Sequence, residues 1–226
     1  MLRRRIAPRP RGFSLIELMV GTTAGLLLVA SAIAIFGTQL AAAHKTRLEV
    51  RLNQDLRAAA DVVARDLRRA AYWQSAILGT TATGTGSATT PNPYRATTAA
   101  GGAVGYSFSR DSVENNTLDA PEQFGFRLHS DHSLQMQTAS GAWQSLTDPE
   151  VLRITAFTIT PTETTLPLGD LCPTGCAAGS PNCPSVSVRS FSIVVAGEAV
   201  ADSAIRRELQ LSVRLRNDRL EGVCPP

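Results

Sequence analysis

The chain has 226 residues, 18% of them charged, and a formal net charge of +3. The positive excess depends on five arginines before residue 12; without them, 17 basic side chains face 19 acidic ones. The rest of the chain has no long basic run, only pairs such as Arg68-Arg69 and Arg206-Arg207. Composition and charge therefore argue against nucleic-acid binding and fit one globular domain with a membrane segment.

Residues 12–17 read Gly-Phe-Ser-Leu-Ile-Glu and separate an arginine-rich leader, residues 1–12, from an apolar run. A secretory signal peptide is cut after its apolar stretch, which is then lost. A cut between Gly12 and Phe13 would instead remove only the basic leader. The apolar segment would stay attached to the rest of the chain.

The apolar run spans residues 13–43 and contains one charged residue, Glu17. About 20 apolar residues suffice to cross a bilayer, so the run predicts a transmembrane helix. Five arginines precede it, against Lys45, Arg47 and Arg51 soon after it. Because basic residues favour the cytoplasmic side, we expect a single pass through the inner membrane, with residues 44–226 in the periplasm.

Leader, cut site, acidic residue and apolar run together resemble the type IV pilin and pseudopilin family. The resemblance implies that prepilin peptidase cleaves between Gly12 and Phe13 and that the new N-terminus is methylated. It also implies that Glu17 acts in assembly, since a carboxylate in a membrane helix is costly and usually paired. Its expected partner is the N-terminal amine of Phe13 on a neighbouring subunit, which would set the axial register.

Residues 44–73 continue the helix as an amphipathic segment. No proline occurs from Phe13 through Thr90, and apolar residues recur at steps of three and four, which is typical of one buried stripe. The stripe consists of Leu48, Leu52, Leu56, Ala59, Val63, Leu67 and Ala70. We therefore expect one helix from about residue 13 to residue 73, with its second half packed on a domain.

The remaining residues predict an antiparallel sheet over 104–216. The stretch 79–105, rich in Gly, Thr, Ala and Ser, favours a surface loop. Apolar and β-branched residues then predict strands at 104–108, 124–128, 134–136, 151–159, 191–195 and 209–215. A hairpin through 129–132 joins the second and third strands, and a long loop, 161–184, follows the fourth. The sum is an α+β fold, pilin-like by the resemblance, with one long N-terminal helix packed on an antiparallel β-sheet.

Four cysteines, Cys172, Cys176, Cys183 and Cys224, lie in the last quarter of the chain. In an oxidising periplasm an even count predicts two disulfides, for which three pairings are possible. The alternative is a four-thiolate zinc site, whose usual signal is paired Cys-x-x-Cys motifs that are not seen here. A bond from the loop to the C-terminal cysteine would pin the tail, but the sequence leaves the pairing open.

Two polar clusters contain residue types that bind metals. The first is a possible metal trio, His129, Asp131 and His132; the second, a possible calcium loop, comprises Asp111, Glu114, Asn115, Asn116 and Asp119. Polar residues at a hairpin turn explain the first, and the second lacks the glycine and terminal glutamate of an EF-hand loop. We expect neither a metal nor a cofactor.

An enzyme is not expected either. A membrane-anchored hydrolase needs a nucleophile, a base and an orienting group. The chain has three histidines, of which His44 abuts the apolar run. It contains no Gly-x-Ser-x-Gly, no His-Glu-x-x-His and no phosphate-binding loop.

Three segments narrow the resemblance to PilW-type minor pilins. They are residues 55–57, Asp-Leu-Arg, residues 64–72, Ala-Arg-Asp-Leu-Arg-Arg-Ala-Ala-Tyr, and residues 213–217, Val-Arg-Leu-Arg-Asn. This implies a subunit that joins other minor pilins and the major pilin, primes type IV pilus assembly at an inner-membrane platform, contacts membrane lipid and reaches the cell surface in the pilus. J-class pseudopilins of type II secretion systems share the arginine-rich helix end and are the alternative.

Overall fold

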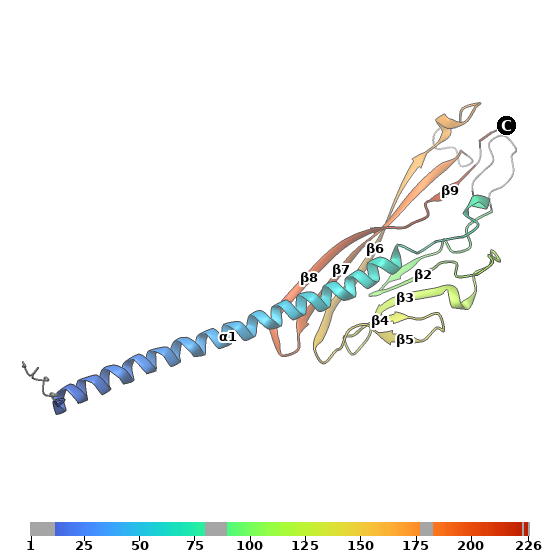
Figure 1. Cartoon of the computed structure of the whole chain (residues 1–226). Helices are drawn as coiled ribbons and strands as arrows, with labels where there is room; N and C mark the ends of the chain where they lie inside the picture. The colour runs from blue at the N-terminus through green and yellow to red at the C-terminus, as the bar shows by residue number, and fades with distance from the viewer. Residues whose placement is uncertain (1–11, 80–89, 177–182, 223, 226) are drawn as a thin grey trace, which may run out of the picture. The chain divides into compact units, whose positions relative to one another are not determined.

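The computed structural model describes residues 12–79, 90–176, 183–222 and 224–225. One long helix, α1 (Leu15–Leu67), precedes the strands (Figure 1). In chain order the strands are β1 (Thr98–Ala100), β2 (Ala103–Ser107), β3 (Gln123–Leu128), β4 (Leu134–Gln137), β5 (Trp143–Ser145), β6 (Leu152–Pro167), β7 (Ser185–Ala199), β8 (Asp202–Arg214) and β9 (Arg219–Glu221). Short 3-10 helices are formed by Ala76–Gly79, Ala120–Glu122 and Gly169–Leu171. The fold is α+β, as expected.

The second half of α1 buries the apolar stripe that its periodicity predicts. Its buried residues are Leu52, Leu56, Ala59, Ala60, Val63, Ala64 and Leu67. The expected helix end at residue 73 is wrong, because the helix stops at Leu67. Ala71 adopts a left-handed φ of 61°, and its N–H donates to the carbonyl of Ser107 at 2.8 Å instead of continuing the helix. Strand β2 therefore captures the chain where the helix ends.

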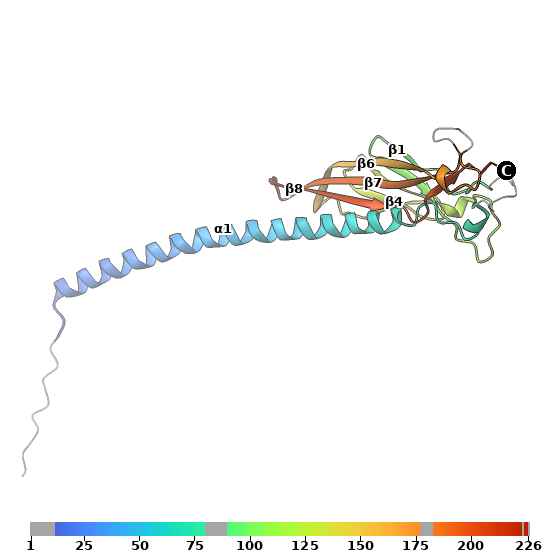
Figure 2. The same cartoon turned by 90° about the horizontal axis from the view of Figure 1, so that it is seen from above.

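The strands form two sheets where the sequence predicted one. The first has the order β1-β2-β3-β4-β5, and the second β6-β7-β8, with β9 also on β7. All pairs are antiparallel, and the predicted hairpin at 129–132 joins β3 to β4. Figure 2 shows β8 beside α1, where Arg207 forms a 3.0 Å ion pair with Glu49.

Four strand predictions need correction. Strand β1 lies inside the expected loop 79–105, β9 lies beyond the expected sheet end at residue 216, and β5 was not predicted. Strand β6 runs to Pro167, so the loop expected to begin at residue 161 begins at residue 168. Residues 160–167 are exposed and rich in Thr, which gives no apolar alternation. Their strand conformation comes from pairing with β7.

The core lies between the second half of α1 and the sheets. Tyr106, Phe108, Phe124 and Phe126 form an aromatic cluster with ring centroids 4.4 to 6.4 Å apart. Strand β7 passes close to the helix at Gly197, where a Cβ would lie 3.2 Å from Leu56 Cδ2. The helix and the sheets are therefore held at close range by packing.

Candidate functional site

The predicted cut site precedes α1. Gly12 and Phe13 are exposed and lie outside the helix, which begins at Leu15. Among the described residues, apart from its chain neighbours, no atom lies within 4 Å of where a Cβ of Gly12 would be. The peptide bond between these two residues therefore lies in exposed, non-helical backbone. The basic leader, apart from Gly12, lies outside the described residues.

Glu17 sits in the first turn of α1, where the helix dipole favours a negative charge. Its Oε2 accepts a 3.4 Å hydrogen bond from the N–H of Ser14. The carbonyl of Ser14 accepts from the N–H of Leu18 at 3.1 Å, which marks Ser14 as the residue that caps the helix. Ser14-x-x-Glu17 thus forms the glutamate half of a capping box. The sequence interpretation did not include this intramolecular contact.

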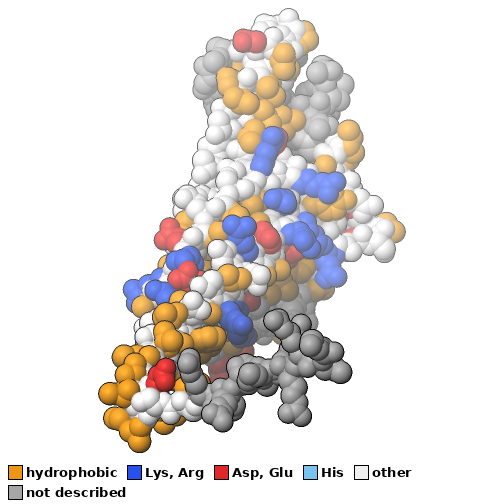
Figure 3. Space-filling model, turned by 60° about the vertical axis from the view of Figure 1, so that its left-hand side comes forward, with side chains coloured by type: hydrophobic (Ala, Val, Ile, Leu, Met, Phe, Trp, Pro, Cys, Tyr) orange, Lys and Arg blue, Asp and Glu red, His pale blue; other side chains and the backbone are white. Residues whose placement is uncertain are grey.

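The first half of α1 is long and apolar enough to cross a membrane, judged by length and composition. Its large apolar side chains are exposed, as Figure 3 shows at the N-terminal end of the helix. Hydroxyl groups in this segment donate to carbonyls three or four residues earlier; they belong to Thr22, Thr23, Ser31 and Thr38. The side-chain hydroxyls are therefore satisfied within the helix, as a bilayer requires.

The arginine-rich helix end fastens α1 to the sheet. Asp66 accepts hydrogen bonds from the Tyr106 hydroxyl at 2.9 Å and from Arg69 at 3.2 Å. The Arg69 guanidinium carbon lies 4.2 Å from the centroid of the Phe108 ring. Burial, together with the negative charge of Asp66, raises the pKa of Tyr106 above its ordinary value. In the sequence, residues 64–72 stood out only by their resemblance to PilW-type minor pilins. Their contact with β2 is visible only in the structure.

Two asparagines bind the backbone just after the end of α1. The carbonyl of Ala71 accepts hydrogen bonds from the side-chain amides of Asn92 at 2.9 Å and Asn217 at 3.0 Å. The carbonyl of Arg68 accepts from the N–H of Arg216 at 3.2 Å. Backbone carbonyls at a helix end need such partners. The tail after β8 therefore supports the helix end directly.

The first polar cluster is organised by hydrogen bonds at the β3–β4 turn. Asp131 accepts from the hydroxyl and the N–H of Ser133, and these bonds lower the pKa of Asp131 to about 2. It also forms a 3.0 Å contact with His129 Nδ1. Nδ1 of His132 instead lies 3.2 Å from the carbonyl of Ile154. The side chains of His129, Asp131 and His132 therefore do not converge on one point where a metal could bind.

The second polar cluster ties the 111–119 loop to the end of the helix. Glu114 accepts from the Tyr94 hydroxyl at 2.9 Å, and Asn116 accepts from Trp73 Nε1 at 3.0 Å. Burial raises the pKa of Glu114, but hydrogen bonds from Ser109 and Tyr94 outweigh it, so the pKa lies below its ordinary value. Within the described residues, no group of three His, Cys, Asp or Glu side chains is placed to hold a metal.

The four cysteines form two disulfides. Cys172 pairs with Cys224, with Cα atoms 5.3 Å apart, and Cys176 pairs with Cys183, with Cα atoms 5.8 Å apart. The first links the loop after β6 to the C-terminal tail, and the second closes a small ring. With both pairs oxidised, the thiolates that a zinc site would need are absent.

A protein-family model described as "Prepilin peptidase-dependent protein B" matches residues 45–215. Neither the comparison with curated proteins nor that with solved structures finds a match. The family match covers well over half of the chain and begins after the apolar run. It is therefore independent of the Gly12–Glu17 motif, which indicates the same peptidase by resemblance. The chain belongs to the prepilin peptidase-dependent protein B family.

Proposed function

We propose that the chain is a minor pilin, of PilW type, that primes or joins type IV pilus assembly after prepilin peptidase cuts between Gly12 and Phe13. One observation carries the proposal: the family match at residues 45–215 lies entirely outside the motif at 12–17. The two halves of the chain thus indicate a prepilin peptidase substrate separately.

The mechanism is structural and has no catalytic step. The apolar half of α1 stores the subunit in the inner membrane, among lipid, with the head in the periplasm. Burial of the exposed apolar side chains against other pilins favours assembly, and the head supplies lateral contacts to the major pilin and other minor pilins. The assembly platform in the inner membrane receives the processed subunit.

Glu17 is suited to exchange partners during this process. In the described chain its carboxylate accepts one exposed 3.4 Å hydrogen bond from Ser14, which is long for such a bond. Cleavage creates a cationic amine on Phe13, and a charge-assisted bond to a carboxylate is roughly twice as strong as a neutral one. A neighbouring subunit's amine can therefore replace the internal contact when a subunit is added.

The test is mass spectrometry of filaments sheared from the source cells. We expect a subunit that begins at methylated Phe13, and we expect only the uncut chain in cells that lack prepilin peptidase. An N-terminus upstream of Gly12 in assembled filaments contradicts the processing. A Phe13 terminus found in membranes but never in filaments contradicts the pilus role and supports the alternative, a J-class pseudopilin.

A further inference from the structure

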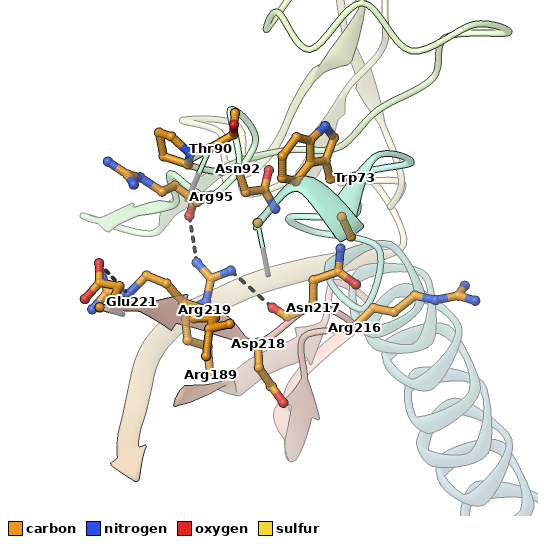
Figure 4. A pocket seen from close by; sticks show the side chains of 15 residues that line it. Trp73, Thr90, Asn92, Arg95, Arg189, Arg216, Asn217, Asp218, Arg219 and Glu221 are labelled. Carbon is orange, nitrogen blue, oxygen red and sulfur yellow. Dashed lines mark hydrogen bonds and ion pairs between the residues drawn. The ribbon is translucent and has the colours of Figure 1, made fainter. Parts of the chain in front are cut away.

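Two neighbouring cavities meet at Arg189, near the C-terminal end of the head. The first, of about 410 Å³, lies between the segment 95–97, strand β6 at Glu163 and strand β7 at Arg189. The second, of about 500 Å³, extends from Arg189 toward Trp73. The Arg189 guanidinium separates them by donating to the carbonyl of Arg95 at 2.7 Å (Figure 4). We call the smaller cavity the arginine cleft.

Arg189 is a partly buried cation that forms no ion pair with a carboxylate of the described residues. Its Nη1 and Nη2 donate to the backbone carbonyls of Arg95 and Asn217, at 2.7 and 3.3 Å. Its Nε is buried and has no hydrogen-bond partner in the part of the chain that the structure describes. Burial lowers the pKa of this guanidinium; the charges of Glu163 and Asp218 oppose the shift, and those of Arg219 and Arg95 add to it. A buried donor without a partner is costly and calls for an explanation.

The charges around the arginine cleft do not balance. Three arginines line it, Arg95, Arg189 and Arg219, against one carboxylate, Glu163. Glu163 faces Arg189 across the β6–β7 pair but is already bound to Arg219 at 2.8 Å. Figure 4 shows the Arg95 and Arg219 side chains on one side of the Arg189 guanidinium, while Arg216 points away on the other. Two more carboxylates, Asp218 and Glu221, line the neighbouring cavity. Asp218 pairs with Arg214 at 2.6 Å, and Glu221 pairs with Arg219 at 3.4 Å. Within the lining of the arginine cleft itself, arginines therefore outnumber carboxylates by two.

We propose that the arginine cleft binds a carboxylate group. Guanidinium groups present several N–H donors in a plane that matches a carboxylate, and the cleft's volume falls in the range of small-ligand sites. Phe191 and Leu215 also line it, which leaves room for a short apolar body beside the charged head. A free dicarboxylic acid and an acidic side chain of a partner protein carry the same chemistry. The site is independent of the pilus role, because it needs only this chain's own residues.

The test is a binding titration on the purified full-length chain in detergent micelles. The chain is labelled with ¹⁵N-arginine, and the Nε–H signals are followed during titration with succinate, with the peptide acetyl-Ala-Asp-Ala-amide and with inorganic phosphate. We expect saturable shifts at millimolar carboxylate or below, led by the Arg189 signal. Saturation by succinate alone indicates a small acid, and saturation by the peptide alone indicates an acidic side chain; both support the site.

The decisive variant is Arg95→Glu. Its side chain is exposed, while the backbone carbonyl that binds Arg189 stays in place, so the fold is expected to survive. Reversing this charge removes the positive excess, and binding should weaken at least about tenfold. The matched control is Arg153→Glu, an exposed arginine of β6 outside the cleft, which should bind as the unchanged chain does. Absence of saturation by either carboxylate, saturation by phosphate alone, or equal binding by Arg95→Glu overturns the proposal.

Discussion

Single residues at the end of α1 decide how the helix meets the sheet. Asp66 is the centre of these contacts, because it accepts from Tyr106 on β2 and from Arg69 on its own helix. Arg69 in turn covers the Phe108 ring, so charge, hydrogen bonding and aromatic packing act on one turn of helix. A change at any of these side chains should therefore loosen the join between helix and sheet.

Replacing Tyr106 with Phe removes the hydroxyl but keeps the ring. We expect the free energy of unfolding to fall by about 1–2 kcal/mol, because Asp66 loses a partner. Since the folded pKa of Tyr106 is raised, its contribution is fully present below about pH 10 and is lost as pH rises further, when the unfolded chain ionises. Above pH 10 the free energy of unfolding of the Tyr106→Phe variant should therefore fall less steeply than that of the unchanged chain. Denaturant unfolding from pH 7 to 11 measures both effects, and an unchanged slope above pH 10 contradicts the assignment.

Replacing Glu17 with Ala should leave cleavage at Gly12 intact and reduce the subunit's share in filaments. A tenfold loss corresponds to about 1.4 kcal/mol, which is modest for one charged pair in a membrane. The control is Ser14→Ala, which keeps the backbone N–H that now binds Glu17. Immunoblots of membranes and sheared filaments give the ratio. Normal incorporation of the Glu17 variant argues against the assembly role.

At the scale of elements, strand β6 shows how a long polar edge is kept from pairing with other chains. It lies at the edge of the second sheet, and its outer half is exposed. Pro161 and Pro167, six residues apart, stand opposite Phe191 and Ser185 of β7. Proline has no N–H, so neither residue can donate a hydrogen bond to a strand that pairs on the free edge. The edge is therefore a poor template for another strand.

The approach of β7 to α1 predicts the effect of Gly197→Ala. The added methyl would lie 2.8 Å from Leu152 Cδ1 and 3.2 Å from both Leu56 Cδ2 and the Arg153 carbonyl. Overpacking of this kind costs about 1–3 kcal/mol, and the thermal midpoint of the head should fall accordingly. Gly37→Ala is the control, since its methyl would meet no atom of the described residues within 4 Å beyond the adjacent backbone of its own helix. Equal midpoints for the two variants would contradict the close packing.

The two disulfides should differ in what they contribute. The Cys172–Cys224 bond spans 52 residues and the Cys176–Cys183 bond spans 7. On the chain-entropy model, replacing the first pair by Ser lowers the free energy of unfolding by about 4 kcal/mol, and replacing the second by about 2 kcal/mol. Denaturant unfolding of the two double variants shows which one loses more free energy of unfolding. A larger loss for the small ring would exclude loop closure as the cause.

At the scale of the whole molecule, the proposed cut after Gly12 would reverse the sign of the net charge. The full chain has an isoelectric point of about 8.9. Loss of five leader arginines leaves 17 basic against 19 acidic side chains, so the mature chain should focus below neutral pH. Isoelectric focusing of the protein extracted from membranes of cells with and without prepilin peptidase measures the change in isoelectric point. A mature protein that still focuses above neutral pH would show that the leader is retained.

The sequence by itself determined the features that depend on local pattern. The apolar run, the buried stripe of α1, the β3–β4 hairpin and the Gly12–Glu17 motif are all readable from residue spacing. The α+β class follows from the same patterns, because period and composition act within a single element.

Only the tertiary structure decided the features that depend on distant backbone. The helix stops at Leu67 because β2 captures Ala71, and β6 extends through Thr-rich residues because β7 pairs with them. The cysteine pairing and the arginine cleft likewise bring together segments far apart in the chain. Such contacts arise from packing and hydrogen bonding between elements, for which one-dimensional spacing carries no signal.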